Sequence, residues 1–151
     1  MRRLYLLLLA LASQQALATN ECMKANRSIA GISIGAKRSD LIAEYGPPRK
    51  SRKLTEAEAL YESKIVYPDA RAYFADSGKL VFLESFRKNK CTASGVCPGT
   101  GVASARQIIG GSVVSSADGN VLSCSISEYA CDLVVLLKNG VVNGIRLQCL
   151  P

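Results

Sequence analysis

The sequence contains no histidine and no tryptophan. Without histidine, the Ser-His-Asp and Cys-His arrangements of nucleophilic enzymes are excluded, because both need an imidazole as general base. A Gly-Thr-Gly stretch at 99–101 precedes an expected helix, but no Gly-Lys-Ser or Gly-Lys-Thr follows it, so we interpret it as a turn. Glu56, Glu58 and Glu62 are clustered carboxylates, yet their segment, TEAEALYES, is typical of a surface leading into a strand. We therefore predict that the protein is not an enzyme and binds no cofactor.

The cysteines are few, even in number and scattered, and no two of them form a CxxC pair. A zinc site would need four of them drawn from distant positions, so metal binding is the weaker interpretation. Disulfides are expected in an oxidising compartment. Spacing alone leaves many pairings open. It favours Cys91 with Cys97, Cys124 with Cys131, and Cys22 with Cys149, the last of which would tie the chain ends together.

The N-terminal 18 residues, MRRLYLLLLALASQQALA, have the pattern of a cleaved secretory signal. Arg2 and Arg3 precede an apolar stretch at 4–12, and Ala-Leu-Ala at 16–18 suits the cleaving peptidase. The apolar stretch is too short to span a bilayer, which takes about 20 such residues. Cys22 lacks the Leu-x-x-Cys context of a lipoprotein signal. We predict a signal peptide at 1–18, and a mature protein in the periplasm or secreted, without stable membrane insertion.

The excess of positive over negative charge lies entirely in one half of the mature chain. Residues 19–90 hold 14 basic and 9 acidic side chains, whereas 91–151 hold 3 of each. The basic residues cluster at 49–53 and 87–90, where they could meet nucleic acid, lipid headgroups or an acidic protein. Export argues against nucleic acid. We favour solvated loops for both clusters, with a partner-facing patch as the alternative.

The first half of the mature chain has the pattern of one helix followed by a three-stranded meander. A helix is predicted at 39–45, with Ser39 as N-cap and Gly46 at its end. Short runs rich in aromatic and branched residues then predict strands, separated by Pro-Asp and Ser-Gly turns. These strands are expected at 60–67, 71–76 and 79–86.

The second half repeats this order. A helix is predicted at 103–109, closed by Gly110, and the dipeptide Asn139-Gly140 predicts a type I′ hairpin. A shift of 64 residues lays Gly46 on Gly110, which indicates an internal duplication. We predict an α+β fold of tandem duplicated units at 19–90 and 91–151, each a short helix followed by an antiparallel meander. The later strands are expected at 120–126, 131–138 and 141–149.

Two local patterns bear on how the second half packs. The run LVVLL at 133–137 is apolar on both faces, so we expect helices on one side and a neighbouring sheet or a partner on the other. If 126–129 is a tight turn, Cys124 and Cys131 lie opposite each other on adjacent strands.

Aromatic residues are concentrated in the first half, and four polar or aromatic side chains share one expected hairpin there. Tyrosine and arginine on an exposed sheet are the composition that interfaces favour. We predict partner contacts at this hairpin, by Tyr67, Asp69, Arg71 and Tyr73.

The segment IGAKRSDLIAEYGPP at 34–48 resembles the Ile-x-x-Gly-Met-Ser/Thr-x-x-Glu-Val-x-x-x-x-Gly-x-Pro signature of SmpA/BamE-like domains and of the beta-lactamase inhibitor proteins, which carry it twice. Ala36 and Lys37 replace its Met-Thr. DLVVLLKNGVVNGIRL at 132–147 is similar to the closing hairpin of those inhibitors. The resemblance implies a tandem helix-plus-sheet fold whose concave sheet surface grips another protein. It also implies that Asp69 and Tyr73 match part of the Asp-Tyr-Tyr-x-Tyr hairpin that contacts the inhibited enzyme.

Together these patterns lead to the hypothesis of an exported binding protein that inhibits a protein partner by covering its active site. The form we favour is a periplasmic immunity protein in bacterial competition, acting as a monomer or in a 1:1 complex on a secreted antibacterial toxin. The alternative is an envelope-assembly accessory of SmpA/BamE type, which the missing lipoprotein signal disfavours.

Overall fold

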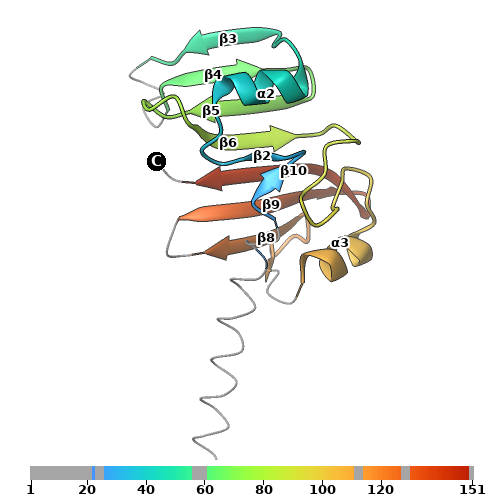
Figure 1. Ribbon diagram of the computed structural model, residues 1–151. Helices are drawn as coiled ribbons and strands as arrows, with labels where there is room; N and C mark the ends of the chain where they lie inside the picture. Colours follow the sequence, from blue (N-terminus) through green and yellow to red (C-terminus); the bar gives the residue numbers. More distant parts are fainter. Residues whose placement is uncertain (1–21, 23–25, 56–60, 111–113, 127–129, 150–151) are drawn as a thin grey trace, which may run out of the picture.

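The computed structural model describes residues 22, 26–55, 61–110, 114–126 and 130–149 (Figure 1). The signal peptide predicted at 1–18 lies outside them. The fold is α+β: in the described residues, an eight-stranded antiparallel sheet carries the two helices α2 and α3 and a small β1–β2 hairpin (Ser28–Ile29 and Ile32–Ser33). Within the described part of the chain, no helix is long and apolar enough to cross a membrane.

The sheet has the strand order β3-β4-β5-β6-β10-β9-β8-β7. The first half supplies β3 to β6 and the second supplies β7 to β10, and the two meet where β6 pairs antiparallel with β10 (Figure 1). Both halves therefore share one continuous sheet. The strands are β3 (Lys50–Lys53), β4 (Ser63–Val66), β5 (Ala70–Phe74), β6 (Leu80–Ser85), β7 (Val114–Ser115), β8 (Val121–Ile126), β9 (Cys131–Lys138) and β10 (Val141–Cys149).

Helix α2 (Arg38–Tyr45) begins one residue before the predicted start. Its N-cap is Lys37, whose backbone N–H donates to Asp40 Oδ2 at 3.0 Å, so the prediction of Ser39 as N-cap was wrong. Asp40, the third residue of the helix, accepts the N-cap N–H as in a capping box, and Ser39 lies inside the helix, where its hydroxyl donates to Asp40 Oδ1 at 3.3 Å. Leu41 and Tyr45 face the core, and the helix ends as predicted at Gly46 (φ +82°).

Helix α3 (Val102–Ile109) has the same length as α2 and ends in the same way, at Gly110 with φ +91°. The approach to each helix is also alike. Gly35 N–H donates to Leu80 O at 2.7 Å before α2, and Gly99 N–H donates to Val142 O at 2.7 Å before α3. Each helix is thus held against the last strand of its own half by the same backbone contact.

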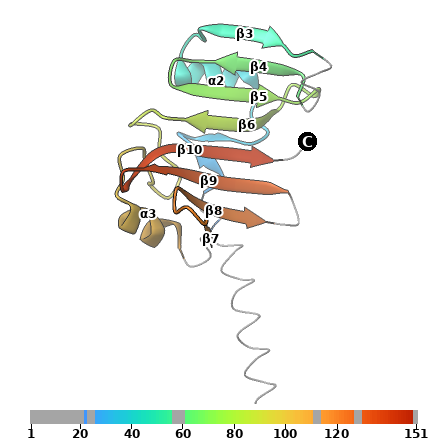
Figure 2. The same cartoon turned by 180° about the vertical axis from the view of Figure 1, so that it is seen from behind.

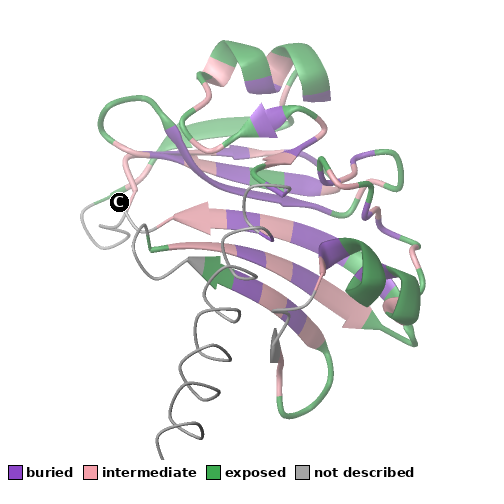
Figure 3. Cartoon of the chain, turned by 60° about the horizontal axis from the view of Figure 1, so that its bottom comes forward, coloured by how far each residue is buried: buried purple, intermediate pink, exposed green. Residues whose placement is uncertain are grey.

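The helices cover one face of the sheet. Helix α2 lies in front of β4 and β5 in Figure 1 and behind them in Figure 2, which shows the sheet from the other side. A single core cluster joins Leu41 of α2 and Ile109 of α3 to Leu83 and Leu147 of the central strands. Buried residues alternate with less buried ones along β9 and β10 (Figure 3), as expected for a sheet packed on one side.

Strand β3 was predicted as a solvated loop, and that prediction was wrong. All of its residues are exposed, but the strand pairs with β4 from Lys50 to Lys53 and forms the edge of the sheet. Lysine and arginine are common on edge strands, because their charge opposes pairing with another chain. The cluster at 87–90 also differs from a solvated loop: Arg87 and Lys90 are engaged in ion pairs, although Lys88 is exposed.

The three disulfides confirm that all six cysteines are oxidised, and they are consistent with export. Cys91–Cys97 forms as predicted, in the segment between β6 and α3. The other two predicted pairs, Cys124 with Cys131 and Cys22 with Cys149, were wrong. The observed pairs are Cys22–Cys124 and Cys131–Cys149.

The sheet register explains the error. Cys131 lies opposite Ile126 on β8, and Cys124 lies opposite Leu133, so Cys124 and Cys131 are two positions out of line. On the other side of β9, Cys131 pairs directly with Cys149 of β10, which brings their Cα atoms to 3.9 Å. The predicted tight turn at 126–129 lies largely outside the described residues.

Candidate protein-binding face

The face of the sheet opposite α2 is built by strand alternation. Across β5, β6 and β10, Arg71 lies opposite Glu84, which lies opposite Arg146, and in the next row Tyr73, Phe82 and Gln148 are aligned. We call this surface the open face. It comprises the side chains of Lys50, Arg52, Lys64, Val66, Arg71, Tyr73, Phe82, Glu84, Arg146, Gln148, Asp132 and Val134.

Glu84 lies at the centre of the open face and holds two arginines. Arg71 donates from Nε to Glu84 Oε2 at 2.6 Å, and Arg146 donates from Nε and Nη2 to Oε1 at 2.9 and 2.7 Å. The Glu84 side chain is only 2% exposed, against 44% for Arg71 and 27% for Arg146. A buried carboxylate needs such partners, and here it fixes the positions of two cations, the exposed Arg71 and the half-buried Arg146.

Aromatic rings lie beside this charged row. Phe82 is nearly buried, with the guanidinium carbons of Arg71 and Arg146 at 5.7 and 5.6 Å from its ring centre. Tyr73 meets Phe82 edge-on at 5.0 Å, and Lys64 Nζ lies 5.1 Å from the Tyr73 ring centre. Rings and cations packed in this way present a surface with little freedom left to lose on binding.

The open face is strongly cationic on its first-half side. On the strands β3 to β6 and β10, all fully described, the open face holds five basic side chains and one carboxylate, that of Glu84. The basic ones are Lys50, Arg52, Lys64, Arg71 and Arg146.

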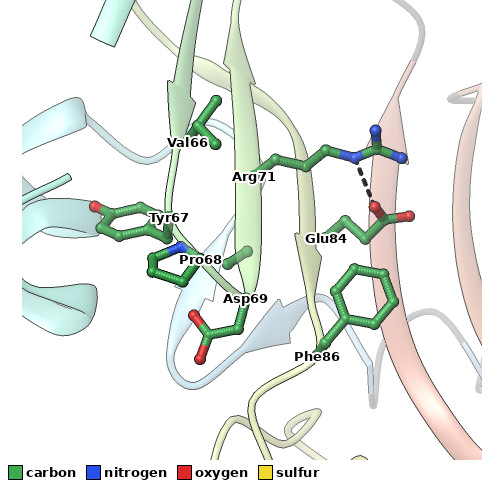
Figure 4. A pocket seen from close by; sticks show the side chains of 8 residues that line it. Val66, Tyr67, Pro68, Asp69, Arg71, Glu84 and Phe86 are labelled. Carbon is green, nitrogen blue, oxygen red and sulfur yellow. Dashed lines mark hydrogen bonds and ion pairs between the residues drawn. The ribbon is translucent and has the colours of Figure 1, made fainter. Parts of the chain in front are cut away.

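A hollow of about 310 Å³ opens beside Arg71, at the start of β5 (Figure 4). Val66, Pro68 and Phe86 supply much of its apolar lining, and Glu84 and Arg71 form one wall. Phe86 is held across Gly144 of β10, since a Cβ at position 144 would lie 2.6 Å from the Phe86 ring. The hollow therefore combines an apolar lining with a guanidinium at its side.

The structure separates the four predicted partner-binding residues. Arg71 and Tyr73 both lie on the open face. Tyr67 is instead buried on the helix side, where its ring packs 5.6 Å from that of Tyr45. Asp69, in the turn between β4 and β5, accepts a hydrogen bond from Arg87 Nε at 2.6 Å. Of the four, Arg71 and Tyr73 form a common surface.

The buried tyrosines form a second cluster, on the helix side of the sheet. Within the part of the chain that the structure describes, the buried hydroxyls of Tyr45 and Tyr67 have no hydrogen-bond partner. Burial raises the pKa of Tyr45 to about 12, although the nearby Ser85 hydroxyl and Arg87 guanidinium offset part of the rise. Burial also raises the pKa of Tyr67.

Cations from the 87–90 segment close this cluster. Arg87 lies 5.1 Å from the Tyr45 ring centre and donates from Nη1 to Tyr45 O at 3.0 Å. Lys90 Nζ donates to Glu44 O at 3.1 Å and pairs with the Glu44 carboxylate at 2.5 Å. Both cations bind the last carbonyls of α2, where the helix dipole is negative, so their role here is to hold the helix end.

Sequence reasoning missed Glu84, Phe82, Arg146 and Lys64 as parts of the surface. A signal for two of them exists in the strand patterns: LVFLES carries a glutamate directly after four apolar residues, and GIRLQ carries an arginine between two apolar ones. Alternation alone places these side chains opposite their apolar neighbours. What it does not give is the register that brings Glu84 and Arg146 side by side.

The run at 133–137 agrees in part with its prediction. Leu133 and Val135 are buried against the core, whereas Val134 and Leu136 are half-buried on the opposite side. Cover of that second side by a partner stays a prediction. Among the described residues, no group of three or more histidine, cysteine, aspartate or glutamate side chains is placed to hold a metal ion.

Comparison of the chain with protein-family models, with curated proteins and with solved structures gives no match.

Proposed function

We propose that the protein is an exported inhibitor that binds a partner protein through the open face and covers the partner's active site. The observation that carries this proposal is the row Arg71–Glu84–Arg146 over Phe82, in which a buried carboxylate holds one exposed and one half-buried guanidinium beside aromatic rings. Arginine and tyrosine in fixed positions are the side chains that dominate binding energy in protein interfaces. Excess positive charge would also speed encounter with an acidic partner.

We further propose that the two halves are tandem duplicated units. Support comes from the paired helices with equal lengths and from the matching contacts of Gly35 and Gly99 with β6 and β10. Each half also has an irregular register at the same place: between Tyr73 and Phe74 where β5 pairs with β6, and between Val142 and Gly144 where β10 pairs with β9. Resemblance to the beta-lactamase inhibitors would follow from such a duplication.

Within this proposal the site of action is the periplasm or the extracellular medium. The disulfides need an oxidising compartment, and the predicted signal at 1–18 would take the chain there. The partner class that fits is an enzyme met in that compartment, of which a secreted antibacterial toxin is the example we favour. Inhibition then needs no chemistry from this chain, only a surface that excludes substrate.

Affinity capture tests the proposal. The mature protein, immobilised under non-reducing conditions, is exposed to exported proteins of the producing strain and of its competitors, and captured proteins are assayed for loss of enzymatic activity. Two variants alter the open face, Tyr73→Ala and Lys64→Glu, and Ile108→Ala removes an exposed apolar side chain of α3 as a matched control.

We expect the wild type and the Ile108 variant to recover the same enzyme in inhibited form, and both open-face variants to recover at least tenfold less. Recovery of no enzyme, or equal recovery by all variants, would contradict the proposal.

A further inference from the structure

The hydrogen bonds of Arg71 leave most of its donors unused. Its guanidinium engages Glu84 through Nε alone, and neither terminal nitrogen donates to any described residue. Arg146 uses Nε and Nη2, which leaves Nη1. Arginine binds a carboxylate best through two parallel N–H groups, and the terminal nitrogens of Arg71 form such a fork.

Glu84 determines the net charge of the cluster that it forms with Arg71 and Arg146. One carboxylate faces two guanidiniums, so the cluster carries a net charge of about +1 where Arg71 meets solvent. A single further carboxylate would neutralise it. A phosphomonoester, with a charge of about −1.5 to −2, would exceed it and would meet repulsion from Glu84.

The hollow beside Arg71 indicates a second feature of the ligand, an apolar side chain. Its lining of Val66, Pro68 and Phe86 is apolar, and Phe86 is 38% exposed. Asp69, which also borders the hollow, is already paired with Arg87. An apolar side chain would bury area here, next to the carboxylate on Arg71.

We infer that Arg71 and Arg146 form a carboxylate receptor on the open face, and that it binds an acidic segment of the partner in which an aspartate or glutamate adjoins an apolar side chain. Glu84 is the positioning residue that holds the receptor in place. The inference rests on the proposed function for its biological partner, but the receptor itself is a property of this chain.

The probe is a capped peptide, acetyl-Gly-Ser-Val-Glu-Val-Ser-Gly-amide, titrated into the ¹⁵N-labelled mature protein and followed by NMR. Matched peptides carry glutamine or phosphoserine in place of the glutamate. The readouts are the arginine Nε–Hε signals of Arg71 and Arg146 and the dissociation constant. The protein variants are Arg71→Gln, Arg71→Lys, and Lys79→Gln as a charge-matched control in the exposed β5–β6 turn.

We expect the glutamate peptide to shift both arginine signals, and to bind at least about fivefold more tightly than the glutamine peptide. Arg71→Gln should weaken binding by a similar factor. Arg71→Lys should recover only part of the loss, because lysine keeps the charge and loses the fork. Lys79→Gln should change affinity less than twofold. Amide spectra of the variants verify that each is folded.

Equal affinity for the glutamate and glutamine peptides, unmoved arginine signals, or tighter binding of the phosphoserine peptide would overturn the inference. The peptide titration is independent of partner capture. If capture of an enzyme depends on Tyr73 but the glutamate peptide does not bind, the proposed function is supported and the carboxylate receptor is not. If the peptide binds as expected but no enzyme is captured, the receptor is supported and inhibition of an enzyme is not.

Discussion

Glu84 and Arg146 lie 62 residues apart in the chain, and their side chains meet on the open face, with Arg146 Nη2 at 2.7 Å from Glu84 Oε1. The first residue comes from β6 and the second from β10, the two strands that join the halves of the sheet. The charged centre of the open face therefore forms only when both halves are folded together.

Removing the charge of Glu84 tests this junction. Glu84→Gln should lower the free energy of unfolding by about 2 kcal/mol, because charge-assisted hydrogen bonds to two arginines are weakened around a buried position. Urea denaturation of the disulfide-intact protein measures it. Lys79→Gln, in an exposed turn, should change stability by less than about 0.5 kcal/mol. Equal midpoints for the two variants would show that Glu84 does not hold the junction.

The substitution Tyr45→Phe should affect stability differently at neutral and at alkaline pH. At pH 7 the substitution should be close to neutral, because the hydroxyl is buried and, apart from the nearby Ser85 hydroxyl, no described residue is placed to hydrogen-bond with it. The folded-state pKa of Tyr45 is raised to about 12, whereas an unfolded tyrosine titrates near 10. Between these values the unfolded chain releases a proton that the folded chain keeps, so wild-type stability falls as pH rises from about 10 to 12.

The phenylalanine variant lacks this loss, which amounts to about 2 to 3 kcal/mol by pH 12. Thermal or urea midpoints of the two proteins, recorded at matched pH, should therefore coincide or favour the variant at pH 7 and diverge above pH 10. Parallel curves across that range would contradict the raised pKa.

The disulfides should differ in how much they stabilise. Cys22–Cys124 closes a separation of 102 residues, and Cys91–Cys97 one of 6. In the chain-entropy model, replacing the first pair by serines costs about 4 to 5 kcal/mol and replacing the second about 2 kcal/mol. Denaturation midpoints of the two double variants show which disulfide stabilises more, and peptide mapping under non-reducing conditions checks which cysteines are paired. A Cys22–Cys149 peptide in that map would contradict the fold.

The charges of β3 should protect the edge of the sheet. Replacing Lys50 and Lys53 by isoleucine should cause self-association at micromolar concentration, because an exposed strand edge without charge can pair with a second chain. Sedimentation velocity measures it. The same pair of changes at Lys79 and Lys88, which are exposed outside strands, should leave the protein unchanged in sedimentation. Association of both variants to the same extent would assign the effect to hydrophobicity alone.

The helices were predictable because their ends depend on local chemistry. Gly46 and Gly110 mark helix ends by backbone conformation alone, and Asn139-Gly140 marks its hairpin by positive φ at both residues. The exposed β3 was not predictable in the same way, since KSRK has no apolar alternation and becomes a strand only by pairing with β4.

The candidate site depended even more on distant parts of the chain. Arg71 and Tyr73 could be found from one hairpin, but Tyr67 was assigned to the same surface and is buried beside Tyr45. Glu84 and Arg146 required the β6–β10 register, and Cys131–Cys149 required the β9–β10 register. The β6–β10 pairing joins strands far apart in sequence and is set by tertiary packing, whereas the β9–β10 pairing lies within one hairpin, in which the irregular register between Val142 and Gly144 places Cys149 opposite Cys131.

The central claim, that the open face inhibits a partner by covering it, is tested most directly by titrating the captured enzyme's activity with the mature protein. We predict loss of activity that is complete at a 1:1 ratio. The concentration for half inhibition should rise at least tenfold for Tyr73→Ala and stay unchanged for Ile108→Ala. Full activity at saturating protein, or equal inhibition by both variants, would contradict the claim.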